Sequence, residues 1–190
     1  MKYNTAIATL VLLCPVWATL ADEKTDPEPK TVEVKAQDLT LVVPESWKQQ
    51  QPSNRLRLTQ FLVPANTAGV DDSEVVVFPP LLGSIEQNIQ RWIDQFASDG
   101  RQFKAVQGEA PQGKYILVEL TGTYNKPDGP PVLGKTVPTP GYSMIGVILT
   151  AEKGNYFLKL VGPAESVKTE LAAFRKCFGG DTANEKKYDF

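Results

Sequence analysis

Histidine is absent from this 190-residue sequence, and its absence excludes several kinds of site. Histidine is the commonest general base near neutral pH, the usual ligand of zinc and copper, and the standard partner of a nucleophilic serine or cysteine. The sequence also has no phosphate-binding loop, dinucleotide fingerprint or EF-hand loop. We therefore expect no catalytic residue, no metal site and no cofactor, and the composition favours a protein that is not an enzyme.

Cysteine and net charge are also scarce. The two cysteines are Cys14 and Cys177, and Cys14 lies in a segment that we expect to be removed, so no intramolecular disulfide is predicted. The chain has 20 basic and 22 acidic residues, and without Lys2 the balance is 19 minus 22, or −3. This balance implies no strongly basic surface, which argues against sequence-independent binding of nucleic acid.

Long hydrophobic runs are few, and the run near the N-terminus is too short for a membrane span. Lys2 precedes an apolar core over about residues 6–16, which small residues follow. This is the pattern of a secretory signal peptide over residues 1–21. A bilayer span needs about 20 apolar residues, and Pro15 interrupts this run. We expect an exported protein, periplasmic or secreted, with no transmembrane segment in the mature chain.

The residues before Cys14 raise the question of a lipid anchor. Val11, Leu12 and Leu13 have the aliphatic character of a lipobox. Leu13, however, occupies the position at which such a motif needs a small residue. Lipid attachment at Cys14 is therefore not expected.

The remaining chain divides into a linker, a domain and a tail. Residues 22–30 combine charge and proline without apolar residues, which is typical of a disordered linker. Residues 31–180 have ordinary apolar content and are long enough to bury one core, so they predict a single α+β domain. Residues 181–190 are polar, and we expect a flexible C-terminal tail.

The domain contains eight segments with the pattern of β-strands. The first two and the last two are each expected to form a hairpin, Gly122 is expected to mark a β-bulge, and residues 74–78 predict a central strand covered on both faces. In the third segment, Leu56, Leu58 and Phe61 are expected to point inward. The segments are residues 31–35, 39–44, 55–63, 74–78, 102–106, 113–124, 142–151 and 156–161.

The clearest helix lies between Ser84 and Gly100. Ser84 and Gln87 have the spacing of a capping box, and Gly100 is typical of the residue that ends a helix. We expect this helix to organise the fold, because its apolar residues lie within one stripe at about 100° per residue. These residues are Ile85, Ile89, Trp92, Ile93 and Phe96.

A second helix is predicted between Gly162–Pro163 and Gly179. Proline is tolerated in the first turn of a helix, and the helix has an apolar face that includes Phe174 and Phe178. Cys177 lies beside these aromatic residues. We expect it to be a small buried side chain rather than a reactive thiol.

A polar stripe borders the apolar stripe of the first helix. It consists of Asn88, Arg91 and Gln95, and we expect it to face residues 126–141, which contain five prolines and are too long for an ordinary hairpin loop. The stripe would either bind an anionic group or hydrogen-bond to carbonyl groups of that loop. Trp47 is a core residue or a stacking platform for a ligand. The candidate partner-binding or ligand-binding residues are therefore Asn88, Arg91, Gln95 and Trp47.

The order of these elements resembles the PsbP/Mog-like fold. An early hairpin ends in the sequence LVVPESW (residues 41–47), and a covered strand, a long helix, three further strands and a terminal helix follow. Over about residues 31–178 the chain also resembles a group of exported bacterial proteins of unknown function. The motifs that carry this second resemblance are Gly83–Ser84, Asn88–Trp92, Gln95–Phe96 and Leu158–Pro163.

The resemblance implies a fold and no site. PsbP proteins of photosystem II and Ran-binding Mog proteins share an antiparallel sheet sandwiched by helices, which implies an α+β fold of α/β/α layers here. PsbP proteins have been associated with ion retention and with histidines, which this chain lacks. A Ran-binding role needs a nuclear partner that an exported chain would not meet. Function does not follow from fold alone, so no residue role is carried over.

Three functions remain open at this point. The first is an exported, non-enzymatic binding or assembly module for an unknown protein partner, using residues 126–141 and the polar stripe. The second is a small-ligand carrier with a cleft between the sheet and a helix, and with Arg91 or Trp47 at its mouth. The third is a carboxylate-based hydrolase, which needs acidic groups such as Glu119, Asp71 and Asp94 to converge in one pocket. The sequence does not indicate an oligomeric state.

Overall fold

The computed structural model describes residues 29–129 and 134–190. The expected signal peptide, Cys14, most of the linker and the centre of the segment 126–141 lie outside these residues. Among the helices of the described part, none combines the length and the apolar character needed to cross a bilayer.

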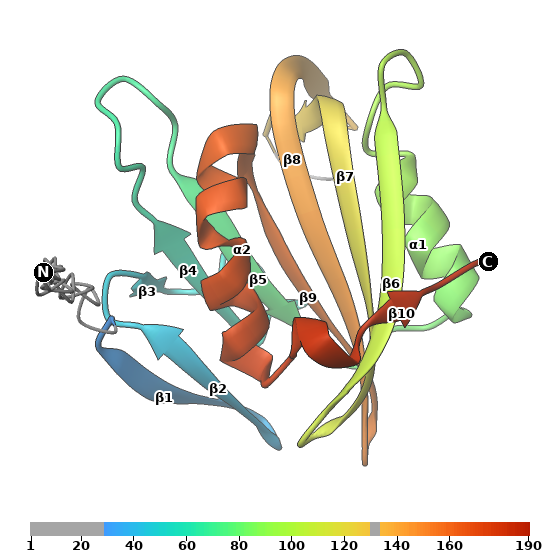
Figure 1. Ribbon diagram of the computed structural model, residues 1–190. Coiled ribbons are helices and arrows are strands. Elements are labelled where there is room, and N and C mark those ends of the chain that lie inside the picture. Colours follow the sequence, from blue (N-terminus) through green and yellow to red (C-terminus); the bar gives the residue numbers. More distant parts are fainter. Residues whose placement is uncertain (1–28, 130–133) are drawn as a thin grey trace, which may run out of the picture.

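Most of the domain is one antiparallel sheet of eight strands (Figure 1). This arrangement, with helices on its two faces, confirms the expected α+β class. From one edge of the sheet to the other, the strands are β10 (Lys186–Lys187), β6 (Gln102–Ala110), β7 (Gly113–Pro127), β8 (Thr136–Ala151), β9 (Gly154–Pro163), β5 (Ser73–Phe78), β4 (Thr59–Val63) and β3 (Lys48–Gln50).

Helices and a separate hairpin cover the two faces of the sheet. One face packs against α2 (Ala164–Phe178) and against the hairpin of β1 (Thr31–Ala36) and β2 (Leu39–Pro44). The other face packs against α1 (Ile85–Ile93). We call these the α2 face and the α1 face. In Figure 1, α1 lies on the β6 side of the sheet, away from β3 and β4.

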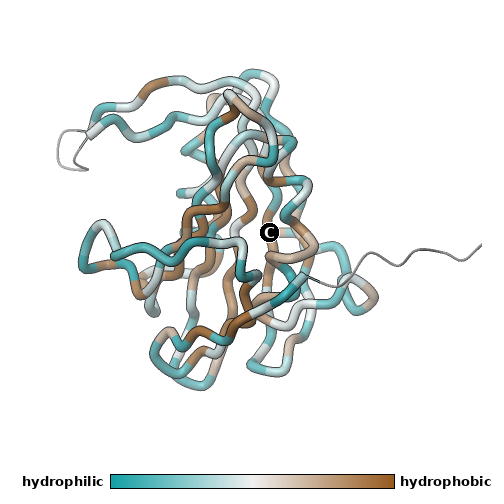
Figure 2. The backbone as a smooth tube through the Cα atoms, turned by 90° about the vertical axis from the view of Figure 1, so that its left-hand side faces the viewer, coloured by the Kyte–Doolittle hydropathy of each residue, from teal (hydrophilic) through white to brown (hydrophobic). Residues whose placement is uncertain are grey.

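Side chains of the long strands alternate between the two faces. Along β8, Ile145 and Leu149 belong to the core on the α2 face, whereas Met144 and Ile148 belong to the core on the α1 face. Because both faces are covered, the strand is apolar almost without interruption. Figure 2 shows the apolar stretches along the strands inside the molecule, with polar loops at the ends.

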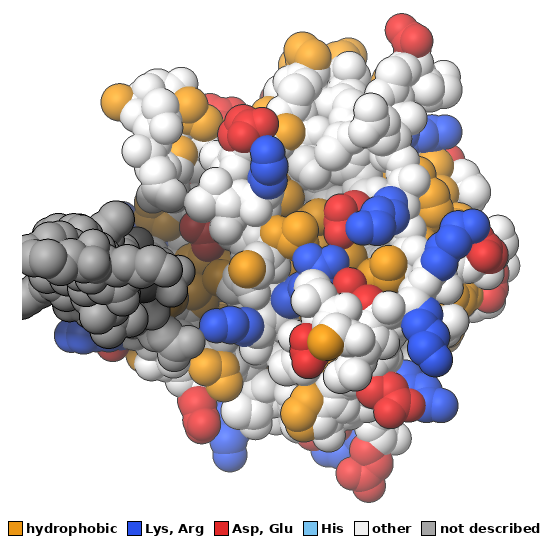
Figure 3. Space-filling view, in the orientation of Figure 1, with side chains coloured by type: hydrophobic (Ala, Val, Ile, Leu, Met, Phe, Trp, Pro, Cys, Tyr) orange, Lys and Arg blue, Asp and Glu red, His pale blue; other side chains and the backbone are white. Residues whose placement is uncertain are grey.

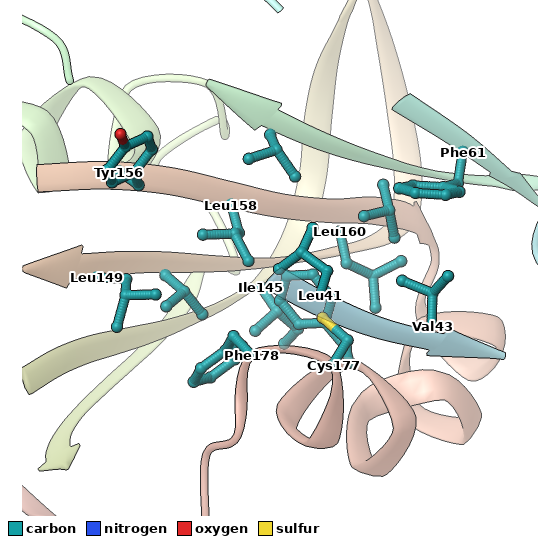
Figure 4. Packing of buried hydrophobic residues seen from close by; sticks show 14 of the residues in the cluster. Leu41, Val43, Phe61, Ile145, Leu149, Tyr156, Leu158, Leu160, Cys177 and Phe178 are labelled. Carbon is teal, nitrogen blue, oxygen red and sulfur yellow. The ribbon is translucent and has the colours of Figure 1, made fainter. Parts of the chain in front are cut away.

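The core on the α2 face is the larger of the two. It contains 22 buried residues, against 13 on the α1 face. Figure 4 shows Leu41 and Val43 of β2, together with Cys177 and Phe178 of α2, beside Ile145 and other residues of the sheet. The expectation that the first helix organises the fold is therefore wrong, because α2 and the β1–β2 hairpin cover more apolar surface.

The first helix is also shorter than its pattern predicts. The expected capping box between Ser84 and Gln87 is present, but the helix ends at Ile93 instead of near Gly100. The backbone then leaves the helix and pairs with β7: the Ala97 amide donates to the Thr123 carbonyl at 2.9 Å. Backbone pairing with a strand thus ends the helix before its apolar pattern ends.

Residues 126–141 form mostly strand rather than a long loop. The end of β7 pairs with the start of β8 from Tyr124↔Thr139 to Pro127↔Thr136, beyond a register shift at Gly122 that confirms the expected bulge. We call residues 123–127 and 136–141 the β7–β8 arm. In Figure 2 it projects from the body toward the upper left. Pro138 and Pro140 are tolerated because this part of β8 pairs with β7 alone, and its pairing with β9 begins only at Tyr142.

Two further segments differ from expectation. Strand β4 begins at Thr59 rather than Arg55, because Asn54 forms a turn in which its side chain accepts from the Leu56 amide. Leu56, expected to point inward, is 65% exposed. Residues 181–190, expected to be a flexible tail, include a 3₁₀ turn at Thr182–Asn184 and strand β10, which pairs with the edge of β6.

The packing of α1 on the sheet depends on Gly146. A Cβ atom at this position would lie 2.5 Å from the Trp92 ring. Gly146→Ala should therefore destabilise the protein by about 1 to 3 kcal/mol, as overpacked core substitutions do, measured by urea unfolding. The cost should fall when Trp92→Leu is also present. An equal cost in both backgrounds would show that Trp92 is not the obstacle.

Candidate functional site

One row of residues crosses the α1 face and leads to the candidate site. In register, it runs through Val118 of β7, Gly146 of β8, Lys159 of β9, Val76 of β5 and Gln60 of β4. Trp92 of α1 lies against Gly146, and Lys159 is the next residue of the row. Beyond Gly146 the row continues on the side of the sheet from which α1 is absent (Figure 1).

Polar side chains, instead of a helix, cover this half of the α1 face. Val76 is fully buried although no helix lies over it, and it stands between the long side chains of Lys159 and Gln60. We call the group the sheet-face cluster. Its members are Arg57, Gln60, Asp71, Glu74, Gln95, Tyr124, Lys126, Tyr142 and Lys159.

Lys159 is largely buried and has only neutral hydrogen-bond partners. Its Nζ donates to Oε1 of Gln95 at 3.2 Å and to the hydroxyl of Tyr124 at 3.4 Å, and it lies 5.7 Å from the centroid of the Tyr124 ring. Burial lowers the pKa of Lys159 to about 8, an effect that the charge of Glu74 partly offsets. A strongly shifted pKa in such surroundings is typical of functional sites.

Glu74, the acidic residue near Lys159, is already paired with Arg57. Glu74 accepts from Nη1 of Arg57 at 2.7 Å, and the same Nη1 donates to Oε1 of Gln60 at 2.9 Å. Nε of Arg57 is buried and has no hydrogen-bond partner within the described chain. Glu74 therefore neutralises Arg57 and makes no ion pair with Lys159.

Two stacked tyrosines connect the cluster to the arm. The rings of Tyr124 and Tyr142 are 6.0 Å apart and inclined by 7°. Burial, helped by the charge of Glu74, raises the pKa of Tyr124 to about 12, so its hydroxyl stays protonated and can donate. Tyr142 donates to Oδ2 of Asp71 at 2.7 Å, and Lys126 lies 3.2 Å from the same oxygen.

This contact also joins the arm to the β4–β5 loop, residues 64–72. The hydrogen bond from Tyr142 and then that from Lys126 lower the pKa of the Asp71 carboxyl, so Asp71 is an anion near neutral pH. The ion pair holds the loop against the arm at the margin of the cluster.

The four residues proposed from sequence lie in three places. Gln95 belongs to the sheet-face cluster. Arg91 donates to the side chain of Asn88 at 2.9 Å and to the Leu82 carbonyl at 3.2 Å, and Asn88 donates to the Ser84 carbonyl at 2.8 Å. These two residues therefore stabilise the start of α1 instead of facing the arm.

Trp47 lies inside the core on the α2 face. It is 4% exposed, and its Nε1 donates to Glu170 of α2 at 2.9 Å. Its ring packs near Phe61 and Phe174. The structure thus places Trp47 as a core residue, the first of the two interpretations given from sequence.

The carboxylates required for a hydrolase do not converge. Glu119 accepts from Arg175 of α2 at 3.1 Å, on the α2 face. Asp71 is bonded to Lys126 of the arm and to Tyr142, and Asp94 accepts from Gln90 at 2.8 Å. In the described residues there is no group of three or more acidic or cysteine side chains placed to hold a metal ion. Cys177 is buried, and burial raises the pKa of its thiol well above the ordinary value.

A pocket of about 820 Å³ lies near the start of α1. Ile85 of α1, Tyr115 and Ile116 of β7 and Glu185 of the C-terminal segment contribute to its lining. Glu185 is engaged by Arg175 at 2.8 Å and by the Tyr115 hydroxyl at 3.1 Å. Neither Arg91 nor Trp47 borders the pocket, so it differs from the cleft expected for a ligand carrier.

Sequence reasoning missed most of the cluster. Lys159, Tyr124, Tyr142, Arg57 and Glu74 were not among the candidates. One local signal was available: Lys159 interrupts the otherwise apolar run Tyr156–Val161, and a charged residue in a covered strand requires an explanation.

No protein-family model and no curated protein matches the chain. Among solved structures, it is similar to the solution structure of cyanobacterial PsbP (CyanoP) from Synechocystis sp. PCC 6803, with 12% sequence identity and a TM-score of 0.42 over 78% of this chain and 86% of that chain. At these values the likeness supplies no argument about a partner, ligand or activity, and the resemblance to exported bacterial proteins stays a prediction.

The buried ammonium of Lys159 predicts a specific pH dependence of stability. Below pH about 8 it is protonated in both the folded and the unfolded chain, so the full cost of burying it is present. Between pH about 8 and 10.5 the folded chain loses this proton first, so stability rises with pH. Lys159→Met should therefore stabilise the protein at pH 7 by about 1 to 3 kcal/mol, with the gain shrinking toward pH 10.

Urea unfolding of both chains at several pH values measures this difference. Comparing the two chains cancels the titration of the tyrosines. Lys104→Met is the matched control, because Lys104 is exposed on β6, and its difference from the wild type should not change with pH. A constant difference for Lys159→Met would contradict the assignment of the low pKa.

Proposed function

We propose that the protein is an exported, non-enzymatic binding module that holds a protein partner on the sheet-face cluster and the β7–β8 arm. The observation that carries the proposal is the largely buried Lys159, which has no acidic partner on a half-face without helix cover. Burying a lysine in this way costs stability. Such local costs are expected at functional sites.

The margin of the cluster has the composition of an interface. Val70 precedes Asp71 in the β4–β5 loop and is 40% exposed, and Val137 pairs with Lys126 in the arm and is 51% exposed. Two exposed apolar side chains therefore flank the Lys126–Asp71 ion pair. Apolar contacts beside a polar rim are usual at protein interfaces.

The α2 face of the molecule has fewer features of a binding surface. Figure 3 shows basic and acidic side chains intermingled over α2 and the C-terminal segment, with no patch of one sign. The small-ligand carrier remains the second candidate, and the 820 Å³ pocket favours it. It is less well supported, because Glu185 in the pocket lining is already bonded to Arg175 and Tyr115.

Site-specific photo-crosslinking in the source organism tests the binding surface. A photo-reactive amino acid placed at Val70 or Val137 should crosslink the same partner. Leu82 is the matched control, because it is a 92% exposed apolar residue in the segment before α1. Crosslinks of equal yield from all three positions, or none from Val70 and Val137, would refute the proposal.

Export is tested separately by the mass of the mature protein. Cell fractionation should recover the chain outside the cytoplasm, and mass spectrometry should show that about the first 21 residues are missing. Replacement of Leu12 and Leu13 by charged residues should block both changes. A full-length protein in the cytoplasmic fraction would contradict export.

A further inference from the structure

Three hydrogen-bond donors of the sheet-face cluster have no acceptor within the described chain. An ammonium group has three N–H donors, and the neutral oxygens of Gln95 and Tyr124 take two of those on Lys159. The Tyr124 hydroxyl accepts from Lys159, and its own proton has no acceptor within the described chain. Nε of Arg57 is also buried without a partner. Buried donors without acceptors are rare, and an absent ligand is one explanation for them.

The charges near Lys159 do not balance either. Lys159 and Arg57 bring two positive charges, and Glu74 brings one negative charge. These groups share one part of the face: Glu74 lies on β5 two residues from Val76, the register partner of Lys159, and Arg57 is hydrogen-bonded to Glu74. The charges of Glu74 and Arg57 accordingly act on the pKa of Lys159. Lys126 and Asp71 form a pair of their own at 3.2 Å. One positive charge is therefore left over in the cluster.

We infer that Lys159, Tyr124 and Arg57 form a binding site for one carboxylate, supplied by an aspartate or glutamate side chain of the partner. This inference rests on the proposed function. A single carboxylate matches the excess of one charge, and its two oxygens accept the free donors of ammonium, hydroxyl and guanidinium groups. A phosphate dianion would overcompensate the charge.

The site fits a protein partner better than a free small molecule. Neither the 820 Å³ pocket nor the pocket beside α2 includes Lys159 in its lining, so neither of them would enclose a small molecule bound at this site. A side chain presented by a partner gains the surrounding surface, which includes Val70 and Val137. The rest of the interface then contributes to the affinity.

Acetate is a probe for the carboxylate site. The protein is titrated with acetate in solution NMR at pH 6.5, with the ionic strength held constant by chloride. The side-chain signals of Lys159, Tyr124 and Gln95 should shift, and these shifts should reach a plateau as the acetate concentration rises. Lys159→Met should weaken binding about tenfold or more, and Tyr124→Phe should weaken it severalfold, since hydrogen bonds to charged groups are the stronger ones. Lys104→Met should bind acetate as the wild type does.

The pH dependence of acetate binding provides a second readout. Acetate should raise the pKa of Lys159, and its affinity should fall as pH rises above about 8. Glu74, Arg57, Tyr124 and Gln95 face Lys159 in the cluster; among these, the tyrosine titrates well above this range. Shifts that do not saturate, or that are equal in Lys159→Met and Lys104→Met, would overturn the site.

The crosslinked partner is then used to identify the residue that supplies the carboxylate. The partner's acidic residues near the crosslink are replaced one at a time by glutamine or asparagine. One of these replacements should lower the affinity for the wild-type protein as much as Lys159→Met does. The same replacement should cause no further loss when it is combined with Lys159→Met. If crosslinks at Val70 and Val137 persist but acetate does not bind, the binding module stands and the carboxylate site falls. If acetate binds but no crosslink forms, the assignment to a protein partner falls.

Discussion

The pairing of β8 with β7 and β9 is the constraint on which the rest of the structure depends. Both partners follow β8 over most of its length, and side chains along a strand alternate between the two faces. This register sends Leu158 and Leu160 into the core on the α2 face and turns Lys159 toward the α1 face. A shift by one residue would exchange these faces, so the core fixes the position of the partly buried Lys159.

The candidate site exists because α1 covers only part of its face. Gly146 allows the Trp92 ring to approach β8, and the backbone after Ile93 turns to pair with β7 instead of continuing the helix. The remaining half-face is covered by long polar side chains, whose stems shield Val76 as aliphatic surface would. A longer helix would bury that face with apolar residues and remove the cluster.

Local signals in the sequence predicted local structure. The capping box at Ser84, the bulge at Gly122 and the two hairpins follow from the residues at those positions. The end of α1 and the arm were misassigned because backbone pairing with distant strands decides them. Lys159 was missed because a lysine in a strand is normally expected to point to water, and the sequence does not show what covers that face of the sheet. Among the candidates from sequence, Gln95 alone belongs to the cluster, since Asn88 and Arg91 have partners near the start of α1.

Under the proposed function, the two faces of the sheet divide stability from recognition. The α2 face holds the larger core, and its buried charge is matched: Arg175 is bonded to both Glu119 and Glu185. The α1 face contains Lys159 without an acid and Arg57 with an unpartnered Nε. An unmatched buried charge is tolerable because the core on the other face offsets its cost. In the proposed complex, a carboxylate of the partner would remove this cost, and the free energy that the buried charge takes from folding would add to the affinity.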